Sequence, residues 1–167
     1  MHIPTRAEVD AFCGSPGTRW QRVLGFAAPA VLLASIVFIL IRFPSLPERI
    51  PTNYNLAGEI TGYSGRGTLL LMPLIGLVTD GAIALVGRFP KTWNTGVRVT
   101  LYNRVRVYRL VRDLMAELRL TMALFFGGFA VYQSLLPEHF SGNLTGAMVL
   151  ILFIPVARYV VRLFIKK

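Results

Sequence analysis

The chain has 167 residues, 54% of them apolar, and its mean hydropathy is +0.56. A soluble domain holds about 45–50% apolar residues even when glycine is counted, so the composition argues against a soluble fold. The formal charge of +10 would suit a nucleic-acid-binding protein, but the placement of the charges decides that question. Cys13 is the only cysteine, which excludes a disulfide framework and a cysteine-rich metal site.

Four apolar stretches account for this composition, at about residues 23–43, 68–86, 118–136 and 144–165. Each has roughly the 17–25 residues that a helix needs to cross about 30 Å of hydrocarbon. The first stretch is longer than the roughly 7–15 apolar residues of a signal peptide, and no small-residue cleavage pattern follows it. The sequence therefore predicts an all-α membrane protein, with residues 1–167 forming a single membrane domain of four transmembrane helices.

The basic residues alternate between the connecting segments. Only Arg42, Arg49 and Arg66 of the 18 Lys and Arg residues lie at the end of the first stretch or in the segments that follow the first and third stretches. The positive-inside rule then predicts that both termini are cytoplasmic and that the outer loop, residues 44–67, and residues 137–143 face outward. Because this alternation accounts for the net charge, we expect no nucleic-acid partner.

Most of the inner charge lies in a basic segment, residues 88–117. From Val97 to Leu114 apolar residues recur at helical spacing, while Arg104, Arg109 and Arg112 fall on another face. This pattern predicts an amphipathic helix that lies on the inner leaflet and leads into the third span. Each basic residue near an anionic surface contributes about 1 kcal/mol, so this face is expected to bind anionic lipid or an acidic cytoplasmic partner.

The outer loop concentrates proline, glycine, asparagine and tyrosine over residues 46–66. Pro47 and Pro51 favour extended backbone before them, and the run from Ala57 to Glu59 is typical of a turn. We therefore expect a small hairpin with extended pieces at residues 52–56 and 59–63.

Two roles stay open for this loop, a structural cap on the helix ends or a surface that binds a ligand. The candidate binding residues are Asn53, Tyr54, Asn55, Glu59, Tyr63 and Arg66.

The run Leu46-Pro47-Glu48-Arg49-Ile50-Pro51-Thr52-Asn53-Tyr54-Asn55, followed by Gly58-Glu59, Gly62-Tyr63 and an early Pro73 in the next span, resembles the family called domain of unknown function 1648. That domain also forms the front half of the SdpI-type immunity and signalling proteins of Gram-positive bacteria. The resemblance covers roughly residues 28–88, and more loosely the basic helix and third span. It implies a multi-span protein of the bacterial plasma membrane, with relatives that confer resistance to a secreted toxic peptide and pass that signal to a regulator. Many members carry histidine in place of Asn53, an acidic residue in place of Thr61 and lysine in place of Arg66.

Asp80 is the one ionisable residue deep within a predicted span, about 18 Å along the helix axis from Thr68. A carboxylate at that depth costs about 2.5–3.5 kcal/mol on insertion scales, so it should face the bundle interior and find a partner. Two interpretations stay open. Asp80 is either a proton or cation site, or a structural partner of an arginine such as Arg119 or Arg158.

The sequence contains no phosphate loop, nucleophile elbow or zinc-protease motif, and Glu48, Glu59, Glu138 and His139 lack a short metal-ligand spacing. We therefore expect no cofactor, no metal and no catalytic residue. The leading hypothesis is an immunity-type or sensing protein that binds a peptide or lipid-like ligand through residues 46–66. The alternatives are a small transporter that uses Asp80, as a possible homo-oligomer, and an uncharacterised intramembrane enzyme.

Overall fold

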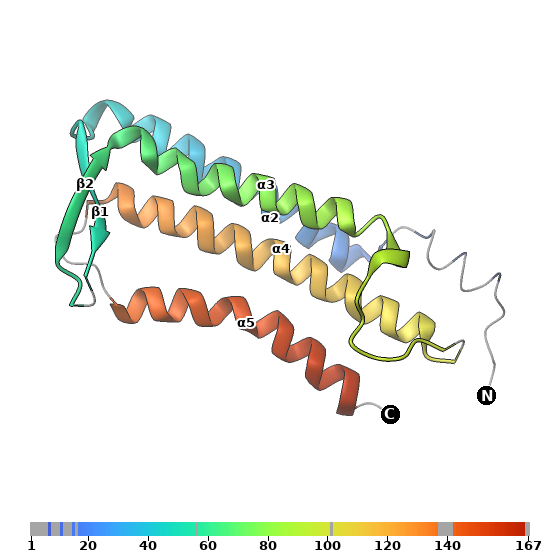
Figure 1. Ribbon diagram of the computed structural model, residues 1–167. Helices are drawn as coiled ribbons and strands as arrows, with labels where there is room; N and C mark the ends of the chain where they lie inside the picture. The colour runs from blue at the N-terminus through green and yellow to red at the C-terminus, as the bar shows by residue number, and fades with distance from the viewer. Residues whose placement is uncertain are drawn as a thin grey trace.

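The computed structural model describes residues 17–55, 57–100, 102–136 and 142–165, together with Ala7, Ala11 and Ser15. Its four long helices lie side by side (Figure 1). They are α2 (Arg19–Arg42), α3 (Leu71–Val86), α4 (Arg104–Ser134) and α5 (Gly142–Ile165). Each of them, α3 together with the short 3-10 helix Arg66–Leu70 before it, is long and apolar enough to cross a membrane. The prediction of four spans is confirmed.

Helices α2, α3 and α4 pack closely because small residues lie where they meet. Ala28 and Leu32 of α2 and Ala123 of α4 are buried together. Gly76 of α3 lies so close to Leu32 that an added Cβ would be 2.6 Å from its Cδ2 atom. Backbones approach this closely only where side chains are small, which is the usual means of helix association in lipid. Helix α5 packs mainly against α4 (Figure 1).

The outer loop forms a β-hairpin at one end of the bundle, which we call the hairpin end (Figure 1). Strand β1 (Arg49–Tyr54) pairs antiparallel with β2 (Ile60–Gly65). Gly58 closes the turn at φ 83°, a left-handed conformation that favours glycine. The hairpin was predicted, but β1 begins at Arg49 rather than at residue 52, because Ile50 is fully buried with Ile39 and Leu69 and draws the strand onto the helix ends. Leu56 lies outside the described residues.

The basic segment differs from the prediction. Helix α4 begins at Arg104, not at Val97, and continues without interruption into the third span. Val97 and Val99 are not helical, and instead pack against Tyr108 and its neighbours on α4. The side chain of Asn103 holds this segment in place, because it accepts a hydrogen bond from the Thr100 amide at 2.7 Å and donates one to the carbonyl of residue 98 at 3.0 Å.

No separate long helix lies among the described residues of the basic segment, and the length of α4 explains this. Its 31 residues extend about 46 Å at about 1.5 Å per residue, whereas the hydrocarbon is about 30 Å thick. The first turns of α4 therefore project beyond the hydrocarbon at the end of the bundle opposite the hairpin. We call this the basic end, because Arg19, Arg88 and Arg104 all lie there.

Candidate functional site

At the hairpin end, Asn55 and Glu59 build the turn of the hairpin. The Asn55 amide donates to the Glu59 carbonyl at 3.0 Å, and the Glu59 amide donates to Oδ1 of Asn55 at 2.9 Å. The side-chain amide of Asn55 also donates to the Glu59 carboxylate at 2.7 Å. The polar side chains of both candidate binding residues therefore make hydrogen bonds that stabilise the turn.

Arg66 fastens the hairpin to the end of α2. Its Nη1 atom donates to the carbonyls of Phe43, at 3.2 Å, and Leu46, at 3.3 Å. Its guanidinium carbon also lies 4.6 Å from the centre of the Phe43 ring, a cation–π contact. Arg66 therefore acts as a clamp on the chain that leaves α2.

Tyr54 is half-buried beside the bundle, and its hydroxyl donates to the Pro51 carbonyl at 3.4 Å. Burial raises the pKa of Tyr54 above its usual value, and the nearby Tyr132 and Tyr63 raise it further. Tyr54 is therefore a neutral phenol at physiological pH and serves as a half-buried packing residue.

Asn53 and Tyr63 are exposed, as Asn55 and Glu59 are, but they do not take part in the hydrogen bonds of the turn. The register places Asn53 opposite Gly62 and Tyr63 opposite Pro51. Asn53 lies over the Gly62 backbone, where an added Cβ would be 2.8 Å from its amide nitrogen. Tyr63 is 61% exposed. Thr61, Tyr63 and Gly65 thus form the exposed face of β2.

Inside the bundle, Asp80 of α3 is only 6% exposed and pairs with Arg119 of α4. Arg119 donates from Nε to Oδ1 at 2.7 Å and from Nη2 to Oδ2 at 3.0 Å. Its Nη2 atom also donates to the carbonyl of Gly25 in α2 at 2.9 Å. This fork joins three helices, and it favours the structural pair over an open cation site because both carboxylate oxygens are occupied.

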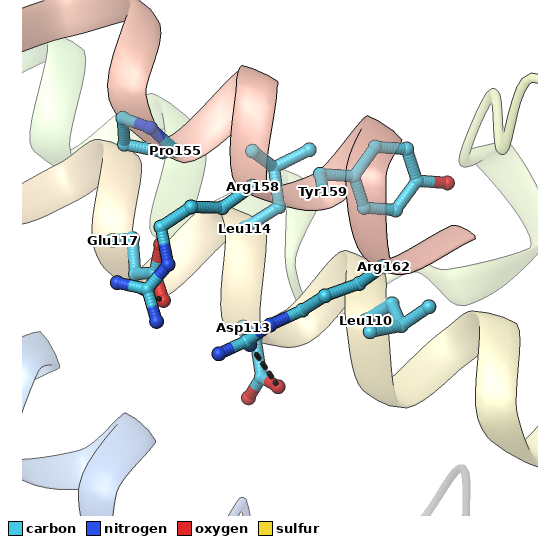
Figure 2. Close-up of a pocket in the computed structure, with 8 residues that line it drawn as sticks. All are labelled: Leu110, Asp113, Leu114, Glu117, Pro155, Arg158, Tyr159 and Arg162. Atoms are coloured by element: carbon cyan, nitrogen blue, oxygen red, sulfur yellow. Dashed lines mark ion pairs between the residues drawn. The ribbon is translucent and has the colours of Figure 1, made fainter. Parts of the chain in front are cut away.

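Arg158, the other arginine considered for Asp80, pairs with Glu117 across the α4–α5 contact, with 3.4 Å between Nη1 and Oε1. One turn nearer the basic end, Arg162 lies 3.9 Å from the Asp113 carboxylate. Figure 2 shows both pairs at the cleft between α4 and α5. The sequence analysis missed Asp113 and Glu117, although their spacing of four residues matches that of the two arginines and would place each set on one helix face.

The three arginines proposed for an acidic partner or anionic lipid do not act alike. Arg104 lies over the Tyr108 ring, 5.4 Å from its centre. Arg112 donates to the Ser15 carbonyl at 3.4 Å, and Arg109 is exposed.

The described residues contain no group of three or more His, Cys, Asp or Glu side chains placed to hold a metal ion. Glu138, His139 and Cys13 lie outside the described residues.

Two cavities on the described part of the bundle bear on function. An apolar groove of about 350 Å³ runs between α2 and α4 and includes Ser35, Phe38 and Gly127 in its lining. A second cavity of about 210 Å³, which we call the arginine cavity, lies between α2, α3 and α4 at the basic end. Its lining consists of Gly17, Gln21, Ile83, Ala84, Gly87, Arg88, Arg112, Met115, Ala116 and Arg119.

Residues 30–77 match the family model described as domain of unknown function (DUF1648). No curated protein and no solved structure matches the chain. The matched range takes in most of α2, the whole hairpin and the first turns of α3. It ends before Asp80, so the buried ion pair lies outside the matched range.

Proposed function

We propose that this protein, whose residues 30–77 match the DUF1648 family model, is a membrane-bound receptor that recognises an extended peptide at its hairpin end, in immunity or sensing. The observation that carries the proposal is the outer edge of β2. The sheet has two strands, and no further strand of the described chain covers β2 (Figure 1). An open strand edge offers backbone donors and acceptors that an extended peptide can pair with as a third strand.

The two strands differ in how well they would accept a peptide. Pro51 lies within β1 and has no backbone N–H, and Ile50 and Pro51 are both buried against the bundle. Strand β2 has no proline, and its exposed face carries Tyr63. Tyrosine supplies a large, rigid contact area with a polar tip, which is why it is common at binding hot spots. A peptide would therefore add to β2.

The frame of the hairpin supports recognition. The Asn55–Glu59 turn and the Arg66 clamp hold the strands in one arrangement before any ligand arrives. A preformed site loses little conformational entropy on binding, which raises affinity for a given set of contacts. On this proposal the cap and the binding surface are the same element, with Asn55, Glu59 and Arg66 shaping it and Tyr63 making contact.

The setting follows from the resemblance to SdpI-type proteins and from the charge pattern. The positive-inside rule places the hairpin on the outer face of the plasma membrane, where a secreted peptide arrives. The protein would then protect the cell against that peptide or signal its presence.

The test is a survival assay. Bacteria that express the protein are grown with a panel of secreted, membrane-active antibacterial peptides, and the tolerated concentration of each is measured. We expect the wild-type chain to raise tolerance of at least one peptide several-fold. Tyr63→Ala, or Thr61→Lys, which places a charge on the open edge, should remove that gain. Tyr102→Ala is the matched control, because Tyr102 is 75% exposed but lies at the basic end. Equal protection by Tyr63→Ala at equal membrane abundance would overturn the proposal.

A small proton-coupled or cation-coupled transporter is the second candidate, because Arg119 both binds Asp80 and lines the arginine cavity. Flux into proteoliposomes would test it. Transport that is lost in the double variant Asp80→Asn, Arg119→Gln, while Tyr63→Ala transports normally, would favour this candidate over the receptor.

A further inference from the structure

The arginine cavity lies at a defined level of the bundle. Helix α3 ends at Val86, just before Gly87 and Arg88 in the lining, and α2 begins at Arg19, between Gly17 and Gln21. Its volume of about 210 Å³ is far more than the roughly 10–15 Å³ that a single water requires. The cavity is therefore a pocket of molecular size at the point where two spans leave the hydrocarbon.

The lining combines positive charge with apolar surface. Among the residues that the structure describes, three arginines and no carboxylate line the cavity, and Ile83, Ala84, Met115 and Ala116 supply apolar wall. Because α3 runs toward the basic end and α4 away from it, Arg88 lies at the mouth and Arg119 at the deep end. A ligand that fits this lining carries negative charge and also an apolar part.

Two carboxylates of the described chain, Asp80 and Asp113, contact residues of the cavity lining, and both already accept hydrogen bonds. Both oxygens of Asp80 accept hydrogen bonds from Arg119. Asp113 accepts one from the side-chain amide of Gln21 at 2.7 Å. The Nη1 atom of Arg119 lies against Gly25 and makes no hydrogen bond to any residue that the structure describes.

We propose that the arginine cavity binds the phosphate headgroup of an anionic phospholipid. Guanidinium groups donate paired hydrogen bonds to phosphate oxygens in a geometry that an ammonium group does not match. A lipid at this level places its phosphate among the arginines and its glycerol and first methylenes against Ile83 and Met115. Basic pockets between transmembrane helices are a recurrent form of such sites. A soluble anion would gain nothing from the apolar wall.

The experiment measures lipid binding to the full chain in detergent by native mass spectrometry. Phosphatidylglycerol, phosphatidylcholine and inorganic phosphate are titrated separately, and the thermal unfolding midpoint is recorded for each. We expect phosphatidylglycerol to bind at one saturable site and raise the midpoint, with phosphatidylcholine at least tenfold weaker and inorganic phosphate without effect at the same concentrations.

Two variants locate the site. Arg88→Gln should weaken phosphatidylglycerol binding roughly fivefold, the change expected when one basic contact near an anionic surface is lost. Ala84→Leu fills the cavity without changing its charge and should weaken binding at least as much. Arg98→Gln is the control, because Arg98 is exposed and does not line the cavity. Arg119 is left intact because it holds Asp80.

Each contrary result has a defined meaning. If Arg98→Gln weakens binding as much as Arg88→Gln, the lipid responds to general charge and the proposed site is wrong. If inorganic phosphate stabilises the chain as strongly as phosphatidylglycerol, the cavity holds a free anion and the lipid assignment fails. Unchanged lipid binding in Ala84→Leu also overturns the proposal. None of these results bears on peptide recognition at the hairpin end.

Discussion

Arg119 and Asp80 form a two-point fork inside the bundle, with 2.7 Å between Nε and Oδ1 and 3.0 Å between Nη2 and Oδ2. Removal of one partner leaves the other charge without compensation, and for buried pairs this costs about 3–5 kcal/mol. We expect Asp80→Ala to lower the free energy of unfolding by about 3 kcal/mol. Asp80→Ala combined with Arg119→Met should recover most of that loss. Unfolding in mixed detergent measures both, and equal losses in the single and double variants would show that the loss does not come from an uncompensated charge on Arg119.

The two pairs between α4 and α5 should hold α5 more weakly. The side chains of Arg158 and Arg162 are 50% and 43% exposed, so each pair is expected to contribute no more than about 1 kcal/mol. The charge reversal Glu117→Arg should speed hydrogen exchange along α5, because it places like charges opposite Arg158. Adding Arg158→Glu should restore the wild-type exchange rate. An α5 that exchanges at the wild-type rate in Glu117→Arg would contradict this role.

Gly76 and Gly81 form a matched test within α3. An added Cβ at Gly76 would lie 2.6 Å from Leu32 Cδ2 and 3.0 Å from Phe126 Cβ, whereas at Gly81 nothing lies within 4 Å. Gly76→Ala should therefore cost about 1–3 kcal/mol of stability through overpacking. Gly81→Ala should be neutral or stabilising by up to about 1 kcal/mol, since alanine favours the helix. The thermal unfolding midpoints of the two variants make the comparison, and a reversed order would mean that the helices are packed differently.

Arg66 should not be replaceable by lysine. Lysine has no planar group to lie over the Phe43 ring while donating to the carbonyls of Phe43 and Leu46. We expect Arg66→Lys to increase hydrogen exchange in the hairpin several-fold and to leave α4 unchanged. Wild-type protection of the hairpin amides in Arg66→Lys would show that a simple positive charge is enough.

The orientation of the chain is tested by thiol labelling in a Cys13→Ser background. Ala57 lies in the exposed hairpin turn and Asn94 is exposed near the basic end. The positive-inside rule predicts that a membrane-impermeant reagent labels Ala57→Cys in intact cells, and Asn94→Cys only after permeabilisation. The opposite labelling would invert the topology and place the hairpin in the cytoplasm.

Local sequence was sufficient for the four helices and the hairpin. A run of about twenty apolar residues has few alternatives to a spanning helix, because its backbone must satisfy its own hydrogen bonds in lipid. The turn at Gly58 was likewise readable from residue type, since glycine tolerates the positive φ found there. The four helices and the hairpin turn depend on residues that are close together in sequence, and the structure contains both.

The pairing of charges needed the tertiary structure. Asp80 and Arg119 are 39 residues apart in sequence. The sequence predicted that Asp80 has a partner, but it did not predict which arginine that partner is. The rotation of each helix about its own axis decides the partners, and it places Arg119 beside Asp80 and Arg158 beside Glu117. The start of α4 was also decided this way, because Val97 fits the helical spacing of the apolar residues that follow it, yet it packs together with Val99 against Tyr108 instead of extending the helix. Hydropathy is a property of a segment, whereas a charge pair or a cavity depends on which faces of separate segments meet.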